Sequence, residues 1–163
     1  MEPHPYRQAF GARDLDGLVS LLADDVVFHS PVIGDPGFEG RDSVATLLAI
    51  VLDVVTDVAY THELGDERAH VLISDARVLG KPFKSTSLLQ FNADRKIREI
   101  WVMARPLTGV VAIAEAIGPQ LAERQGSGRG PAVRALSKPL TGLAAVANRT
   151  GARLIAALNR STA

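Results

Sequence analysis

Two side chains in this sequence, His29 and Arg105, could take part in acid–base or anion-binding chemistry. An imidazole titrates near neutral pH, so His29 could donate or accept a proton at a reaction centre. The guanidinium of Arg105 could bind a carboxylate or an enolate through paired hydrogen bonds. The chain contains no cysteine, which excludes thiol catalysis and disulfides.

Both side chains also have a structural interpretation. His29 lies in a short β-type run in which neighbouring residues alternate between faces, so it faces away from any cavity that Phe28 and Ser30 line. We therefore expect His29 to be a hydrogen-bonded structural histidine, with catalysis as the alternative. Arg105 could instead form an ion pair, which we favour, with one of three carboxylates: Asp24, Asp25 or Glu99.

Other kinds of site find little support in the spacing of residues. The histidines His4, His62 and His70 share no metal-ligand spacing, so we expect no metal and no cofactor. No glycine-rich phosphate loop follows a strand, since the glycines of 126–130 fall in a linker. Asp75 and Arg77 read as a surface pair. Nucleic-acid binding is not expected, because the basic C-terminal part has no aromatic residue.

The segment that must position any site here is 23–40, ADDVVFHSPVIGDPGFEG. It contains a strand-like run, Val26 to Ser30, which Pro31 ends, and then a loop punctuated by glycine and proline. Helical patterns flank it on both sides. A polar strand end between two helices is a plausible wall for a pocket.

The rest of the chain predicts an α+β fold. Tyr6 to Ala23 reads as one helix, or as two short helices if Asp14 caps a new start after Gly11. Arg41 to Val55 reads as the next helix, with Asp42 as a candidate N-cap. Four β-type runs and a further helix follow: Val58 to Glu63, Ala69 to Leu79, Pro82 to Phe91, Lys96 to Ala104 and Val110 to Leu121. A helix–strand–helix unit followed by an antiparallel meander gives a curved sheet with a concave, ligand-accessible side.

Length and charge divide the chain into a domain and a tail. The 163 residues suffice for one domain, and no apolar run approaches the ~20 residues that span a bilayer. Without an apolar N-terminal signal, we expect a cytoplasmic location. All 18 acidic residues lie at or before Glu123, whereas seven of the 18 basic residues lie beyond it. Residues 1–123 therefore carry −7 and residues 124–163 carry +7.

The tail, 124–163, reads as a basic, Ala-rich helical extension after a Gly-rich linker. The motif PLTG occurs at 106–109 and again at 139–142, which indicates either similar helix starts or a duplicated helix. We expect the tail to dock on its own domain or a partner subunit, because the opposite charges attract. Membrane contact is the less favoured alternative, since no Trp or Phe is present to anchor it.

Two stretches, ADDVVFHSPV…FEGRDSV and LLQFNADRKIREIWVMARPLTG, resemble the NTF2-like superfamily in its SnoaL-like branch, which is related to the ketosteroid isomerases. The resemblance covers about 5–120. It implies a bent antiparallel sheet wrapped round N-terminal helices, a mostly apolar cavity and a homodimer formed through the sheet. We expect this dimer to bury Trp101 and Met103.

In the isomerases of this superfamily a carboxylate base moves a proton while a tyrosine and a protonated aspartate stabilise the oxyanion. The resemblance places the tyrosine at Tyr6, making it a further catalytic candidate, but places Ser30 at the base and Ser87 at the aspartate. It therefore supports a cavity and argues against isomerase chemistry. We expect the cavity to be lined by six ligand-binding residues: Tyr6, Phe10, Phe28, Ser30, Phe38 and Ser87.

Two functions remain open. One is an isomerase, lyase or hydrolase that acts on an apolar polyketide, terpenoid or steroid-like metabolite, which requires a titratable group in the cavity. The other is a non-catalytic ligand-binding or dimerisation module, whose cavity has only apolar and hydroxyl-bearing walls.

Overall fold

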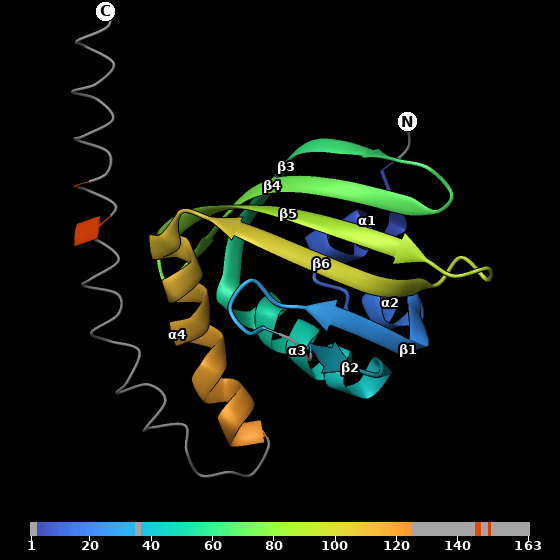
Figure 1. The fold of residues 1–163 in the computed structure, drawn as a ribbon, viewed down its shortest axis with the longest axis horizontal. Helices are drawn as coiled ribbons and strands as arrows, with labels where there is room; N and C mark the ends of the chain where they lie inside the picture. Colours follow the sequence, from blue (N-terminus) through green and yellow to red (C-terminus); the bar gives the residue numbers. More distant parts are fainter. Residues whose placement is uncertain (1–2, 35–36, 125–145, 148–149, 151–163) are drawn as a thin grey trace, which may run out of the picture.

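The computed structural model of the chain describes residues 3–34, 37–124, 146–147 and 150 (Figure 1). Its elements, in order, are α1 (Pro5–Gly11), α2 (Leu15–Ser20), β1 (Leu22–His29), β2 (Phe38–Glu39), α3 (Arg41–Val54), β3 (Val55–Gly65), β4 (Ala69–Val78), β5 (Lys81–Phe91), β6 (Ile97–Arg105) and α4 (Leu107–Arg124). This is the α+β architecture expected from the sequence.

The strands form one six-stranded sheet in the order β2-β1-β6-β5-β4-β3. Strands β3 to β6 make the antiparallel meander that the alternating pattern predicted, whereas β1 joins β6 in parallel. Figure 1 shows the long strands curving over α1, α2 and α3, with α4 across one end of the arch. The core between them is apolar and includes Leu48, Ile50, Leu72 and Ile100, each at most 1% exposed.

The N-terminal helical region follows the second of the two predicted arrangements. A continuous helix from Tyr6 to Ala23 is wrong, because α1 ends at Gly11 and the Asp14 carboxylate accepts the Gly17 N–H at 2.9 Å to start α2. Leu22 and Ala23 instead begin β1. Local capping chemistry therefore outweighs the helical spacing of the leucines.

Several other boundaries also differ from the pattern; for example, β1 covers Leu22–His29 and β3 covers Val55–Gly65. Asp42 is not the N-cap of α3; Gly40 holds that position with φ +82°, a conformation that suits glycine, and Asp42 lies in the first turn. The helix α4 starts three residues earlier than the apolar spacing indicated, at Leu107. The two-residue strand β2 was not predicted, since so short an element has no periodic signal.

The predicted linker and most of the basic tail lie outside the described residues, as does any docking of the tail. Within the tail the structure describes Arg124, which ends α4, and Val146, Ala147 and Thr150, which are helical and exposed. Among the described residues, no helix has the length and apolar character needed to cross a bilayer.

Candidate functional site

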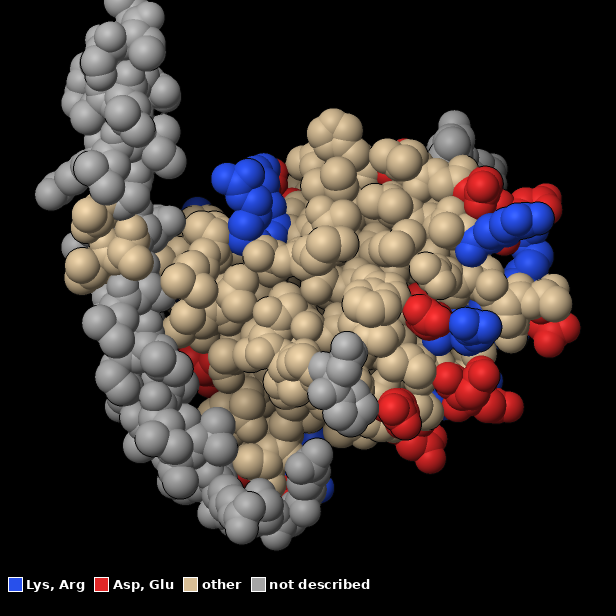
Figure 2. All heavy atoms as spheres, in the orientation of Figure 1, with Lys and Arg blue, Asp and Glu red and all other residues tan. Residues whose placement is uncertain are grey.

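A pocket of about 290 Å³ lies between the sheet and the helices α1, α3 and α4. Its walls are mainly aliphatic and aromatic, with Leu47 and Val51 on α3 and Ile113 and Ile117 on α4. The six side chains expected at a common cavity all line this one pocket: Tyr6, Phe10, Phe28, Ser30, Phe38 and Ser87. On the face of the molecule shown in Figure 2, charged side chains lie mainly toward the periphery and uncharged residues form the middle.

Helix α1 brings Tyr6 and Phe10 to the pocket, one turn apart, with their rings stacked at a centroid distance of 6.2 Å. Tyr6 is 5% exposed. Burial, and to a smaller extent the nearby Tyr60, raises the pKa of the Tyr6 phenol well above its usual value. The phenol therefore stays protonated, and its hydroxyl makes no hydrogen bond with another described residue. It is available as a hydrogen-bond donor to a bound molecule.

Ser30 has a structural task at the end of β1. Its Oγ accepts hydrogen bonds from the backbone N–H groups of Val32 at 3.1 Å and Ile33 at 3.3 Å. These bonds fold the chain back into a tight turn, in the manner of a serine that caps a turn. Val32 and Ile33 are 39% and 52% exposed and line the pocket, so this turn forms part of its rim.

Strand β5 contributes Ser85 and Ser87, which share a face because side chains two residues apart in a strand point the same way. The hydroxyl of Ser85 is hydrogen-bonded to that of Ser74 on β4 at 2.9 Å. The hydroxyl of Ser87 makes no hydrogen bond with another described residue. A neutral serine cannot remove a proton without a partner base, so these groups serve as hydrogen-bonding partners.

The ionisable side chains singled out on β1 and β6 lie on the opposite face of the sheet. His29 stacks on Trp101 and lies 3.9 Å from the Glu99 carboxylate, outside the pocket lining. Arg105 is exposed and lies opposite Lys84 in the β5–β6 register. The ion pair expected for Arg105 does not form, since its three proposed partners lie beyond ion-pair distance and two of them pair elsewhere: Asp24 with Arg41, and Glu99 with Arg98.

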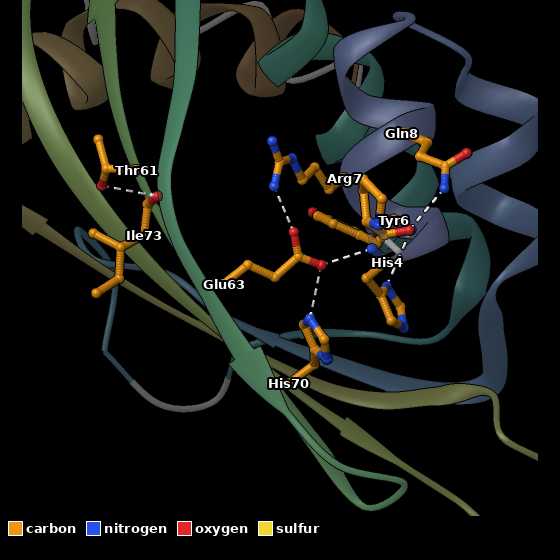
Figure 3. A network of polar contacts seen from close by, with 9 residues as sticks. His4, Tyr6, Arg7, Gln8, Thr61, Glu63, His70 and Ile73 are labelled. Atoms are coloured by element: carbon orange, nitrogen blue, oxygen red, sulfur yellow. Dashed lines mark hydrogen bonds and ion pairs between the residues drawn. The ribbon is translucent and has the colours of Figure 1, made fainter. Parts of the chain in front are cut away.

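One polar cluster escaped the sequence reasoning entirely (Figure 3). The Glu63 carboxylate on β3 accepts the backbone N–H of His4 at 2.6 Å, lies 3.0 Å from Nε2 of His70 and pairs with Arg7 at 2.6 Å. Burial opposes the charge of Glu63, but the hydrogen bonds from His4, Arg7 and His70 outweigh it and lower its pKa to about 2. The pairing of β3 with β4 brings His70 near Glu63, and the packing of the start of α1 on these strands adds His4. Neither contact has a spacing signal in the sequence.

No group of three or more His, Asp or Glu side chains within the described part of the chain is arranged to hold a metal ion. The pocket itself contains one ionisable side chain among its described lining residues, that of Tyr6. Such a site can enclose an uncharged, largely apolar molecule and donate hydrogen bonds to it.

Comparison with known proteins places this arrangement in context. The profile of the SnoaL-like domain matches residues 5–100. A steroid delta-isomerase from Pseudomonas aeruginosa is 34% identical over 74% of this chain and 89% of its own, with a TM-score of 0.68. An uncharacterised conserved protein from Silicibacter pomeroyi, described as having a cystatin-like fold, is 25% identical over 70% of this chain and 80% of its own, with a TM-score of 0.67.

A more distant structure shares the fold alone. It is SalBIII, described as an epoxide hydrolase/cyclase-like enzyme in pyran ring formation in salinomycin. It is 15% identical over 61% of this chain and 84% of its own, with a TM-score of 0.52. A search of curated proteins gave no significant match.

Proposed function

The chain belongs to the SnoaL-like family, and from this premise we propose that it binds a small, uncharged and largely apolar molecule in the pocket between α1, α3, α4 and the sheet. The observation that carries the proposal is the composition of the pocket wall. Apart from the phenol of Tyr6 and the hydroxyls of Ser30, Ser85 and Ser87, the described lining residues are apolar. Burial of apolar ligand surface supplies the affinity, and a few hydroxyls fix the orientation.

The chemistry of the wall narrows the class of ligand. A charged molecule would lose its hydration without gaining an opposite charge from the described lining residues, which is costly. A polyketide, terpenoid or steroid-like skeleton would fill the apolar walls, and one carbonyl or ether oxygen would accept the Tyr6 O–H. The name of one structural relative, a steroid delta-isomerase that is 34% identical, supports a ligand of this kind.

We do not assign steroid double-bond isomerisation to this pocket. That reaction needs a base beside the substrate, and the corresponding position is Ser30, whose Oγ accepts two backbone hydrogen bonds of its own turn. The second expected carboxyl position is Ser87, a neutral hydroxyl. The protein therefore binds its ligand without this proton transfer, and a non-catalytic binding module is the preferred form of the proposal.

The proposal includes a homodimer. Trp101 and Met103 on β6 are 38% and 58% exposed, on the sheet face opposite the pocket. Exposed large apolar side chains that lie together indicate an association surface. A second copy of the chain is the partner that we propose for it.

Binding is tested by titrating the full-length protein with Nile red, an uncharged dye whose fluorescence rises in apolar surroundings, and displacing it with steroid and terpenoid ketones. Ser87→Phe fills the pocket from β5 and should abolish dye binding. Thr86→Phe places the same side chain on the other face of the same strand and should leave binding intact. Equal binding by both variants would overturn the assignment of this pocket.

The absence of isomerisation is tested separately, by following the conjugation of a Δ5-3-ketosteroid in the ultraviolet. The purified protein should show no turnover above the uncatalysed rate. Turnover that Tyr6→Phe abolishes would contradict the proposal and restore isomerase chemistry to the pocket.

A further inference from the structure

The cluster of His4, Arg7, Glu63 and His70 fixes the start of α1 to the hairpin β3–β4 (Figure 3). Glu63 is the shared acceptor and its side chain is 9% exposed. Arg7, one residue after Tyr6, reaches Glu63 at 2.6 Å and lies over the ring of Tyr60 at 5.1 Å. The helix that carries Tyr6 is thus held from β3 by charge-assisted hydrogen bonds.

His4 is the member of this cluster that touches Tyr6 directly. Its Nδ1 accepts the backbone N–H of Tyr6 at 3.1 Å, which makes the side chain the N-cap of α1. Its ring lies between those of His70, at 4.6 Å, and Phe91, at 5.3 Å. A nitrogen that accepts a hydrogen bond carries no proton, so this cap exists only while the imidazole is neutral.

We propose that His4 is a positioning residue: its neutral imidazole holds α1, and with it Tyr6, against the pocket, and protonation in mild acid releases this hold. The proposal rests on the proposed function, because it makes ligand binding depend on pH through a residue that does not line the pocket. A protonated Nδ1 would oppose the Tyr6 N–H and place a positive charge at the positive end of the helix.

The burial of His4 and the charges around it set the direction in which its hold on α1 depends on pH. The ionisable groups that act on it are Glu63 on β3, His70 on β4 and Arg95 on the β5–β6 turn. Arg7 on α1 shares Glu63 with His4, and Tyr60 on β3 lies beneath Arg7. Burial lowers the pKa of His4 most, the neighbouring His70 lowers it further, Glu63 opposes both, and Arg95 adds a smaller lowering. The folded protein binds the His4 proton less readily than the unfolded chain does. The contribution of neutral His4 to the stability of the fold is therefore complete above pH 6.5 and is lost as the pH falls below it.

The test compares three substitutions in the full-length protein. His4→Asn keeps a good N-cap acceptor but cannot titrate, and His4→Ala removes the cap. His62→Asn is the matched control, because it removes an exposed histidine of β3 outside the cluster. Amide hydrogen-exchange protection of α1 is measured at pH 7.5 and 5.5, corrected for intrinsic rates and referenced to α3. Nile red affinity is measured at the same two pH values.

In the native protein, acid should lower α1 protection and dye affinity about fivefold. His62→Asn should respond to acid in the same way as the native protein, whereas His4→Asn should lose neither α1 protection nor dye affinity. His4→Ala should have low α1 protection and low dye affinity at both pH values. An unaltered acid response in His4→Asn, or normal α1 protection in His4→Ala at pH 7.5, would overturn the proposal. Failure of all variants to bind dye would instead refute the proposed function, and α1 protection would still decide the role of His4.

Discussion

The rings of His29 and Trp101 lie nearly parallel, 10° apart, with their centroids separated by 3.5 Å. The indole Nε1–H donates to Glu99 at 2.9 Å, so the stack is also hydrogen-bonded at its edge. Both residues lie on the outer face of the β1–β6 pair, where they are neighbours in register. This places an aromatic surface, continued by Met103, on the side of the sheet away from the pocket.

That surface predicts an effect of charge on assembly. Met103→Asp should convert the proposed dimer to a monomer at micromolar concentration, because an unpaired carboxylate is costly at a desolvated interface. Leu79→Asp, at the β4–β5 turn, is the control: Leu79 is also 58% exposed and should be replaceable without change of mass. Light scattering coupled to size exclusion gives the answer. A native protein that is already monomeric would refute the interface.

A second prediction concerns the packing of α4 on the sheet. A Cβ placed on Gly109 would lie 2.5 Å from Cβ of Phe83, an atom held close to the backbone of β5. Gly109→Ala should therefore lower the free energy of unfolding by about 1–3 kcal/mol. Urea unfolding followed by circular dichroism measures the change.

Gly11→Ala is the matched control for this prediction. No atom lies within 4 Å of the Cβ that it would add at the end of α1. It should leave stability unchanged or raise it by up to about 1 kcal/mol. Equal destabilisation by both variants would show that the loss arises from helix-end effects and not from the α4–β5 contact.

The lining of the pocket could be predicted from local periodicity combined with the family resemblance. Tyr6 and Phe10 are one helical turn apart, and Phe28 and Ser30 alternate with His29 along a strand, so spacing predicts which of them share a face. That these faces meet at one cavity was expected from the resemblance to the SnoaL-like branch. The role of Ser30 was not predictable in the same way. Its two backbone hydrogen bonds depend on the path of the loop after Pro31, which no periodic pattern determines.

The Glu63 cluster shows where sequence reasoning stops. Irregularities shift the β3–β4 register between Thr56 and Ala59 and between Tyr60 and His62, so strict alternation misplaces the residues that follow. The contact of His4 with Glu63 then joins positions 59 residues apart. Similarly, the ion pair expected between Arg105 and Glu99 does not form, because the two side chains share the outer face of β6 but lie at opposite ends of the strand. The neighbour of Arg105 on β5 is Lys84, which has the same charge.

The low pKa of Glu63 predicts the response of stability to acid. The pKa of the Glu63 carboxyl is about 2 in the folded protein against a usual value of 4.5. The contribution of the ionised carboxylate to the free energy of unfolding is therefore complete above pH 4.5 and is lost as the pH falls toward 2. Glu63→Gln should lower the free energy of unfolding by about 2 kcal/mol at pH 6, a magnitude typical of hydrogen bonds to a charged group. The loss should become progressively smaller below pH 4.5. Urea unfolding at pH 6, 4 and 3 measures this difference.

Glu67→Gln serves as the control for the acid response. Glu67 lies 3.7 Å from Arg95 with its side chain 89% exposed, and exposed pairs contribute little. It should unfold like the native protein at each pH. A cost of Glu63→Gln that stays constant down to pH 3 would contradict the assigned ionisation of the cluster.

The last prediction isolates the phenol of Tyr6. Because its hydroxyl makes no hydrogen bond with another described residue, Tyr6→Phe should change the free energy of unfolding by less than about 0.5 kcal/mol. It should weaken binding of a ketosteroid about fivefold, the value of one hydrogen bond, and leave binding of the matching deoxy hydrocarbon unchanged. Tyr60→Phe is the control, since Tyr60 lies outside the pocket lining. Competition against Nile red measures both ligands, and an equal loss for ketone and hydrocarbon would show that Tyr6 acts by packing and donates no hydrogen bond.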